Sequence, residues 1–160
     1  MRPFSESDIT SDYIGWLNDP EVVRFSNQRF KHHDVASCQA YLSSFTDSPN
    51  LFLAMIEIGS NQLIGTMTVY RSVHHETADI GIMIGKRSVW GRGYGKEAFS
   101  LLVTALLGTQ GIRKITAGCL SCNVGMVEVM KYAGLHLEAT RRAQEIVDGN
   151  PEDVVYYARF

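Results

Sequence analysis

Cysteine is scarce in this chain of 160 residues, which contains only Cys38, Cys119 and Cys122. An odd number of thiols does not suggest a disulfide framework of the kind that staples small secreted domains. Cys119 and Cys122 have CxxC spacing, but no second CxxC and no nearby His pair accompany them. We therefore predict no metal site and interpret the cysteines as plain buried or half-buried thiols.

The chain also lacks long apolar runs and an excess of positive charge. Its formal net charge is −2, whereas a nucleic-acid-binding domain is expected to be basic. No run approaches the length of a membrane-spanning helix, and residues 1–6 have no apolar core like that of a secretory signal. We therefore expect a cytoplasmic protein that binds neither nucleic acid nor membrane, folded as one domain over residues 1–160.

Glycine, by contrast, is concentrated in one informative segment. The stretch from Trp90 to Lys96 reads Trp-Gly-Arg-Gly-Tyr-Gly-Lys and stands just before an apolar run at helical spacing. Glycine lets main-chain N–H groups approach a ligand without a Cβ in the way. The first turn of the following helix adds unpaired N–H donors and a partial positive charge. The segment therefore predicts an anion site, most naturally for a phosphate or diphosphate.

Apolar periodicity predicts helices and strands in the order β-α-α-β-β-β-α-β-α-β-β. The expected strands cover residues 1–4, 51–58, 63–70, 78–84, 113–120, 137–146 and 154–160. A first helix, capped by Ser7 or Asp8, ends near Pro20, and further helices cover 34–45, the run after the glycine segment, and 123–132. The third helix is expected to bury one stripe, made of Tyr94, Ala98, Leu101, Leu102, Ala105 and Leu106.

This order excludes two common nucleotide-binding folds. A dinucleotide fingerprint needs a second βα unit and an acidic residue after its next strand. A P-loop needs Gly-Lys-Ser/Thr, and here Lys96 is followed by Glu97.

Three blocks together resemble the GNAT superfamily of acetyl-CoA-dependent N-acetyltransferases. The glycine segment matches its Gln/Arg-x-x-Gly-x-Gly/Ala signature, with Trp90 in place of the usual first residue. Asn123 followed by Ala133-Gly134-Leu135 looks like the family's Asn…Lys-x-Gly-Phe block, and residues 13–22 are similar to the RimJ/RimL-like branch. The resemblance implies an α/β (α+β) fold, with a mixed, mostly antiparallel sheet of six or seven strands and about four helices on its two faces.

The resemblance also implies acetyl-CoA as co-substrate. The loop formed by Trp90, Gly91, Arg92, Gly93, Tyr94, Gly95 and Lys96 would hold its diphosphate. Backbone groups of Ile82, Met83 and Ile84 would line the pantetheine arm, with one N–H polarising the thioester carbonyl, and Asn123 would contact the CoA arm. Asn123 could equally cap the helix that follows it.

For the chemistry we predict a general base and leave the general acid unassigned. Asp79 matches the position of the glutamate used by histone-acetylating members, and Glu76 is the second candidate. Met130 and Met126 occupy the positions where family members carry a proton-donating Tyr or Ser.

The acceptor is expected to be a primary amine, either a protein N-terminus or a small molecule such as an amino sugar or polyamine. Arg24, Arg29 and His75 are the candidate acceptor contacts, the two arginines pointing to an anionic acceptor. A non-catalytic CoA-binding or regulatory module is the alternative of another class. The apolar strand at 154–160 suggests a possible homodimer interface.

Overall fold

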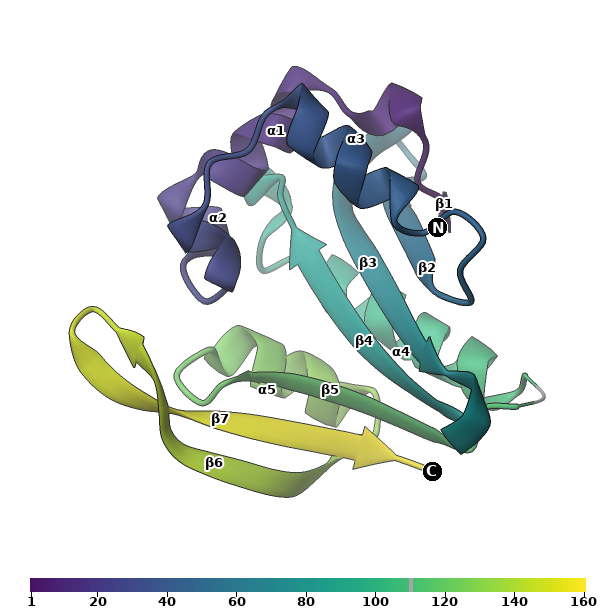
Figure 1. Cartoon of the computed structure of the whole chain (residues 1–160), viewed down its shortest axis with the longest axis vertical. Coiled ribbons are helices and arrows are strands. Elements are labelled where there is room, and N and C mark those ends of the chain that lie inside the picture. Colours follow the sequence, from purple (N-terminus) through teal and green to yellow (C-terminus); the bar gives the residue numbers. More distant parts are fainter. Residues whose placement is uncertain (110) are drawn as a thin grey trace. The chain divides into compact units, whose positions relative to one another are not determined.

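Seven strands are hydrogen-bonded in the order β1-β2-β3-β4-β5-β7-β6 in the computed structural model of the protein (Figure 1). Their bounds are β1 Arg2–Pro3, β2 Leu51–Glu57, β3 Gln62–Ser72, β4 Thr77–Ile84, β5 Lys114–Leu120, β6 His136–Val147 and β7 Asn150–Arg159. The β4–β5 pair is parallel, whereas the β1–β2, β2–β3, β5–β7 and β7–β6 pairs are antiparallel. The predicted mixed, mostly antiparallel sheet is confirmed.

The structure describes residues 1–109 and 111–160. Its α-helices are α1 Ser11–Asn18, α2 Pro20–Val23, α3 Val35–Ser43, α4 Tyr94–Leu107 and α5 Val124–Tyr132. The short α2 was not predicted, because Pro20 was interpreted only as the end of a helix. Proline also suits the first turn of a new one, where its missing N–H costs nothing, and Asp19 caps this turn. Over the described residues we find no helix with both the length and the apolar character that crossing a bilayer requires.

The chain forms two compact units, each made of two separate stretches of the sequence. The first unit contains residues 1–70 and 82–92, and the second contains residues 71–81 and 93–160. Strand β4 therefore contributes its N-terminal part to the second unit and its last three residues to the first. The glycine segment crosses from one unit to the other between Arg92 and Gly93.

The first unit has an aromatic core. Phe4 stacks on Phe52 with ring centres 4.4 Å apart and lies 4.9 Å from the ring of Tyr13. Leu17 and Cys38 join the same buried cluster. Helix α1 therefore buries Tyr13 and Leu17 in this core. Helix α3 buries only Cys38, whereas Val35 is 51% and Tyr41 is 38% exposed.

The start of α1 corrects one prediction. Neither Ser7 nor Asp8 caps this helix, because Thr10 does so by accepting the Tyr13 N–H. Asp8 instead belongs to a 3₁₀ turn and is buried, where its two carboxylate oxygens accept hydrogen bonds from Arg2 at 2.6 and 2.7 Å. This pairing holds the N-terminal segment against the unit.

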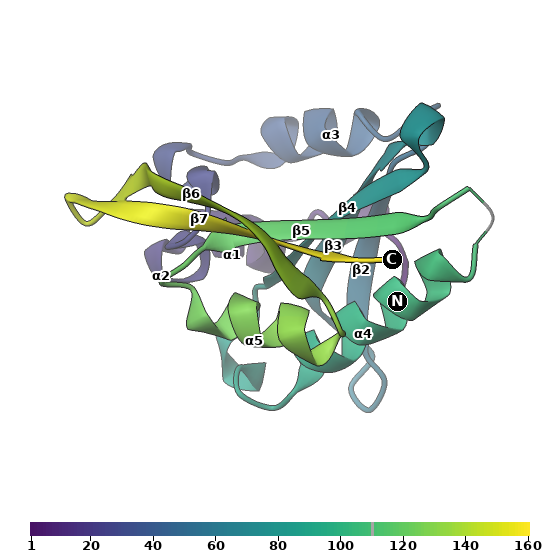
Figure 2. The same cartoon turned by 90° about the horizontal axis from the view of Figure 1, so that it is seen from below.

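In the second unit, α4 and α5 lie on the same side of β5 (Figure 2). Helix α4 buries Phe99, Leu102, Val103 and Leu106, whereas Leu101 is 57% exposed. The predicted stripe was therefore wrong in part. The buried face of α4 is rotated slightly around the helix axis from the predicted one, so that it includes Phe99 and Val103, which are four residues apart, and not Leu101.

Strand β7 corrects a second prediction. It pairs with β5 on one edge and with β6 on the other, so it offers no free edge to a second copy. Its apolar residues are explained by burial inside the unit, as for Val154, Tyr157 and Ala158. The predicted role of this strand as a pairing edge in a homodimer is therefore wrong.

Candidate active site

The glycine segment turns the chain from β4 into α4 through two left-handed residues. A 3₁₀ turn covers Arg87–Val89, and Gly91 and Gly93 then adopt φ values of +74° and +86°. An L side chain is strained at such angles, which explains why glycine stands at both positions. A Cβ at either position would have nothing within 4 Å, so backbone conformation rather than crowding is the constraint.

Helix α4 differs from the other described α-helices in the way its N-terminus is capped. Side chains accept a main-chain N–H at the other four N-termini, namely Thr10 for α1, Asp19 for α2, Asp34 for α3 and Asn123 for α5. The cap of α4 is Gly93, which has no side chain to offer. The Glu97 N–H donates to the Gly93 carbonyl at 3.0 Å, so Gly95 and Lys96 belong to the first turn, whose N–H groups the Gly93 cap cannot satisfy with a side chain. This end of the longest helix therefore suits an external anion as its cap.

Trp90 has a structural role that the sequence did not indicate. Its indole N–H donates to the Ile84 carbonyl at 2.8 Å, which ties the loop to the last residue of β4. The guanidinium of Arg87 lies 5.8 Å from the centre of the indole ring. The Trp90 and Arg92 N–H groups donate within the turn, to the carbonyls of Arg87 and Val89. The loop is thus held by hydrogen bonds within the protein itself.

Two basic side chains border this loop. Arg92 is exposed, and Lys96 belongs to the first turn of α4. The Lys96 ammonium lies 5.7 Å from the centre of the Tyr132 ring, at the last residue of α5. Both positive charges are therefore carried by the segment that leads into α4.

The predicted pantetheine contacts, Ile82, Met83 and Ile84, are half-buried residues at the end of β4. Within the first unit, Gly65 of β3 approaches them so closely that a Cβ there would lie 2.2 Å from the Met83 carbonyl oxygen. The Ile84 carbonyl already accepts the Trp90 N–H. The backbone position of this segment is therefore fixed by its neighbours.

Asp79 and Thr116 meet on neighbouring strands. They are partners in the parallel ladder of β4 and β5, and the Thr116 hydroxyl donates to Asp79 Oδ2 at 2.6 Å. Asp79 is exposed to solvent as a residue, although neighbouring protein atoms partly desolvate its carboxyl group. This desolvation raises the pKa of Asp79 above its usual range, and the hydrogen bond from Thr116 partly opposes the shift. Thr116 was not predicted as a site residue, because only the register of the two strands brings it to Asp79.

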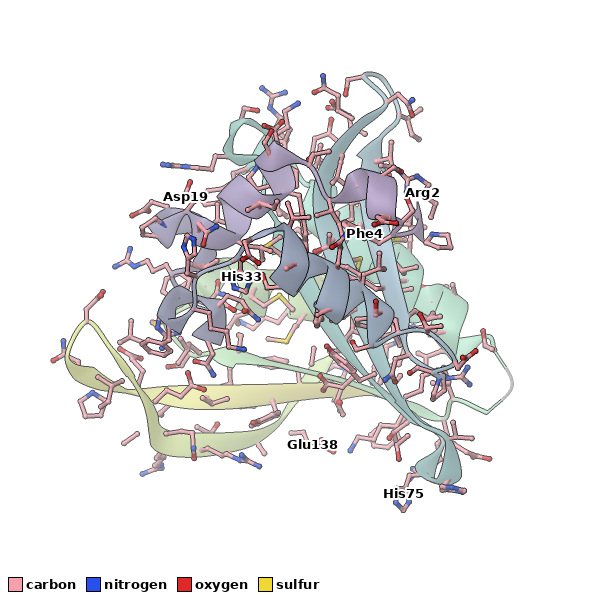
Figure 3. The ribbon with its side chains drawn as sticks, turned by 45° about the horizontal axis from the view of Figure 1, so that its top comes forward. Arg2, Phe4, Asp19, His33, His75 and Glu138 are labelled. Carbon is pink, nitrogen blue, oxygen red and sulfur yellow. The ribbon has the colours of Figure 1, made fainter. Side chains whose placement is uncertain are left out.

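Glu76, the other candidate base, and His75, a candidate acceptor contact, directly precede β4. His75 ends a 3₁₀ turn and its side chain points out from the tip of that turn (Figure 3), and Glu76 follows with φ +53°. Arg113 donates a hydrogen bond to the main-chain carbonyl of each residue. Its backbone N–H donates to Glu76 at 2.8 Å, and its side-chain Nε–H donates to His75 at 3.2 Å. The side chains of both residues are exposed. The structure gives Glu76 no contact with the carboxyl group of Asp79 among the described residues.

Asn123 caps α5, as one of its two predicted roles required. Its Oδ1 accepts the Met126 N–H at 3.1 Å. Met130 is fully buried, and Tyr132 is 64% exposed. The side chain at position 130 therefore belongs to the core, which fits its lack of a proton to donate.

The two predicted acceptor arginines lie in the first unit. The Arg24 guanidinium is 5.4 Å from the ring centre of Phe25, and that of Arg29 is 4.3 Å from the ring centre of Phe30. Lys31 follows directly in the chain. This segment is positively charged and carries exposed aromatic surface, since Phe30 is 72% exposed.

The described residues contain no group of three or more His, Cys, Asp or Glu side chains that could hold a metal ion. All three cysteines are free thiols. Burial raises the pKa of the Cys119 thiol to about 11, so this thiol is protonated at neutral pH.

Comparison with known proteins agrees with this geometry. The acetyltransferase (GNAT) domain family matches residues 1–136 of the chain. The probable N-acetyltransferase YjcK of Bacillus subtilis (strain 168) is 30% identical over 95 residues, which cover 58% of this chain and 52% of YjcK. The chain thus spans about half the length of this curated relative.

Two solved structures share the fold at low sequence identity. Spermidine N-acetyltransferase from Vibrio cholerae, in complex with CoA and spermine, superposes with a TM-score of 0.85 at 14% identity, over 99% of this chain and 92% of that one. RimL, a ribosomal L7/L12 alpha-N-protein acetyltransferase in complex with CoA, gives 0.85 at 16% identity, over the same shares.

The chain therefore belongs to the GNAT family of acetyltransferases. The predicted membership of this family is confirmed.

Proposed function

We propose that this protein transfers the acetyl group of acetyl-CoA to a primary amine by direct attack of the amine on the thioester. The observation that carries the proposal is the N-terminus of α4, which has a left-handed glycine cap and no capping side chain. A diphosphate would accept hydrogen bonds from the N–H groups of this turn, with Arg92 and Lys96 supplying charge. Each charge at a helix end is worth about 0.3–1 kcal/mol when exposed and up to ~2 kcal/mol in tighter geometry.

Asp79 is the proposed general base. It takes a proton from the acceptor ammonium, and the neutral amine forms the new N–C bond to the acetyl group. The nitrogen of the resulting tetrahedral intermediate releases its second proton to solvent as the C–S bond breaks. The thiolate leaves and takes a proton from solvent, because the buried Met130 offers none. The burial that raises the pKa of Asp79 also makes its carboxylate a better proton acceptor at neutral pH. Glu76 stays the second candidate, set back by its position before β4.

The remaining predicted contacts complete the proposal. Main-chain groups at Ile82 and Met83 would line the pantetheine arm, one of them polarising the thioester carbonyl. Ile84 can contribute its N–H, since its carbonyl already accepts a hydrogen bond from Trp90. The unused polar group of Asn123 is its side-chain amide nitrogen, the group we assign to the CoA arm.

For the acceptor we favour an acidic peptide N-terminus, as in the RimJ/RimL-like branch. The positive segment that carries Arg24, Arg29 and Lys31 repels a polycation and attracts a carboxylate. His75 would be a further contact at the entrance to β4. Polyamines and amino sugars are the competing small-molecule acceptors, and a CoA-binding module without turnover is the competing class.

A thiol-release assay with acetyl-CoA and a panel of amines tests this proposal. We expect turnover with peptides whose N-terminal residues are acidic, and weaker turnover with spermidine. Faster turnover with spermidine would contradict the acceptor assignment, and no turnover with any amine, despite CoA binding, would favour the binding module.

Replacing Asp79 with Asn tests the base. At pH 7 only about 0.04% of a lysine-like amine is uncharged, against roughly 10% of an α-amine. We therefore expect the substitution to lower kcat more for a lysine-like acceptor than for an α-amine, with a loss of up to ~10²-fold or more for the former. An unaltered kcat with both would remove Asp79 from the mechanism.

A further inference from the structure

The contact between Thr116 and Asp79 is a hydrogen bond across two parallel strands. The two residues are direct partners in the ladder, so their side chains leave the same face of the sheet. The neighbours of Thr116 along β5, Ile115 and Ala117, are fully buried on the opposite face. The threonine hydroxyl is thus aimed at the carboxyl group from a strand whose position is fixed by its own core contacts.

We propose that Thr116 is a positioning residue for the Asp79 carboxylate. Its hydroxyl donates to Oδ2 at 2.6 Å and so fixes the rotation of the carboxyl group. Oδ1 is then the oxygen that takes the proton from the acceptor ammonium. The catalytic part of this inference rests on the proposed function, in which Asp79 is the base.

The hydroxyl also influences the proton affinity of the carboxyl group. A hydrogen bond donated to a carboxylate favours its charged form, whereas burial favours the neutral form. At Asp79 burial is the larger influence and the Thr116 hydroxyl opposes it. Removing the hydroxyl should therefore raise the pKa of Asp79 further.

Several charged groups of the second unit lie on or beside the strands that flank the Asp79 carboxyl group. Lys114 is two residues before Thr116 on β5, forms an ion pair with Glu138 of β6, and lies 5.2 Å from the ring centre of Phe160. Figure 3 shows Glu138 on that strand. Glu76 precedes β4, and Arg71 lies near the end of β3. All of them stay in place when only the hydroxyl at position 116 is removed.

The experiment replaces Thr116 with Val, which keeps the branched shape and removes the hydroxyl. Carbon-13 NMR of the side-chain carboxyl groups then follows the titration of Asp79 in the full chain. We expect its pKa to rise by about 0.5–1 pH unit, and Thr116→Ser to restore the original value. Thr77→Val, on the adjacent face position of β4, is the matched control and should leave the titration unchanged.

An unchanged pKa in Thr116→Val, with the thermal transition of the wild type, would overturn the proposal. So would an equal shift in Thr77→Val, because the effect would then not belong to the hydroxyl.

The pH profile of kcat separates this inference from the proposed function. If Asp79 is the base, the acidic limb of the profile moves to higher pH by the same amount as the NMR titration, with KM for acetyl-CoA unchanged. If the NMR titration moves and the acidic limb does not, the hydroxyl controls the carboxyl group as proposed, but Asp79 is not the base.

Discussion

Replacing Gly93 with Ala tests the diphosphate loop against a control within the same chain. Gly93 has φ +86° and Gly149, in the turn between β6 and β7, has φ +81°. A Cβ would meet nothing within 4 Å at either position. Alanine should therefore cost each variant the same left-handed strain, about 1–2 kcal/mol.

The two variants should be equally stable but should differ in CoA binding. For a chain of this size the strain corresponds to a decrease in Tm of roughly 2–8 °C, measured by circular dichroism. In Gly93→Ala the strain can be relieved only by moving the first turn of α4, which misplaces the N–H groups meant for the diphosphate. Losing one hydrogen bond to a charged group weakens binding by about 1.5–3 kcal/mol, or roughly 10- to 150-fold in Kd.

Isothermal titration with CoA measures this difference directly. We expect Gly149→Ala to bind CoA like the wild type and Gly93→Ala to bind it at least about tenfold more weakly. Equal affinities in the two variants, at equal loss of Tm, would refute the assignment of this loop to the diphosphate.

Two further predictions concern side chains with defined hydrogen-bond partners. Trp90→Phe keeps an aromatic ring but removes the N–H that donates to the Ile84 carbonyl. We therefore expect several-fold weaker CoA binding by titration calorimetry, with little change in Tm. Unchanged affinity would show that this hydrogen bond does not shape the loop. Asp8→Asn removes the carboxylate held by Arg2, whose hydrogen bonds lower the pKa of Asp8. Because that pKa is lowered on folding, the stabilisation is complete above the unfolded value near ~3.9 and is lost as the pH falls through the folded value. Urea unfolding should therefore show Asp8→Asn to be about 1–2 kcal/mol less stable at pH 7, with the Arg2 side chain 46% exposed. The difference should shrink as the pH falls and the Asp8 carboxylate of the folded wild type becomes protonated; a difference that does not change with pH would have another cause.

Local patterns in the sequence were enough to predict most of the fold. The glycine segment before α4 stands where glycine is needed for left-handed backbone, so it was predicted at the correct residues. The start of α1 was wrong because Asp8 is equally suited to cap a helix and to pair with Arg2. Only tertiary contact decides between these uses.

The candidate site was predictable only where it is continuous in sequence. The loop from Trp90 to Lys96 could be recognised because its glycines and basic residues are adjacent. The contact of Thr116 with Asp79 joins residues that are 37 positions apart. It depends on the register of a parallel pair, which alternation within one strand does not specify.

The misjudged role of β7 has a similar physical origin. An apolar strand can be an interface edge or an internal strand buried by its neighbours, and its composition is the same in both cases. Pairing with β5 and β6 settles the matter for this strand. A homodimer stays a prediction that needs another surface.

Amide chemical shifts measured during titration with CoA test the central claim most directly. Nitrogen-15 spectra of the wild-type chain should show the largest shifts at Gly93, Gly95 and Lys96 when CoA is added. Pantetheine, which carries the thiol arm but no diphosphate, should leave these three amides nearly unmoved. Equal shifts with both compounds, or saturation with CoA while the three amides stay in place, would contradict a diphosphate bound at the N-terminus of α4.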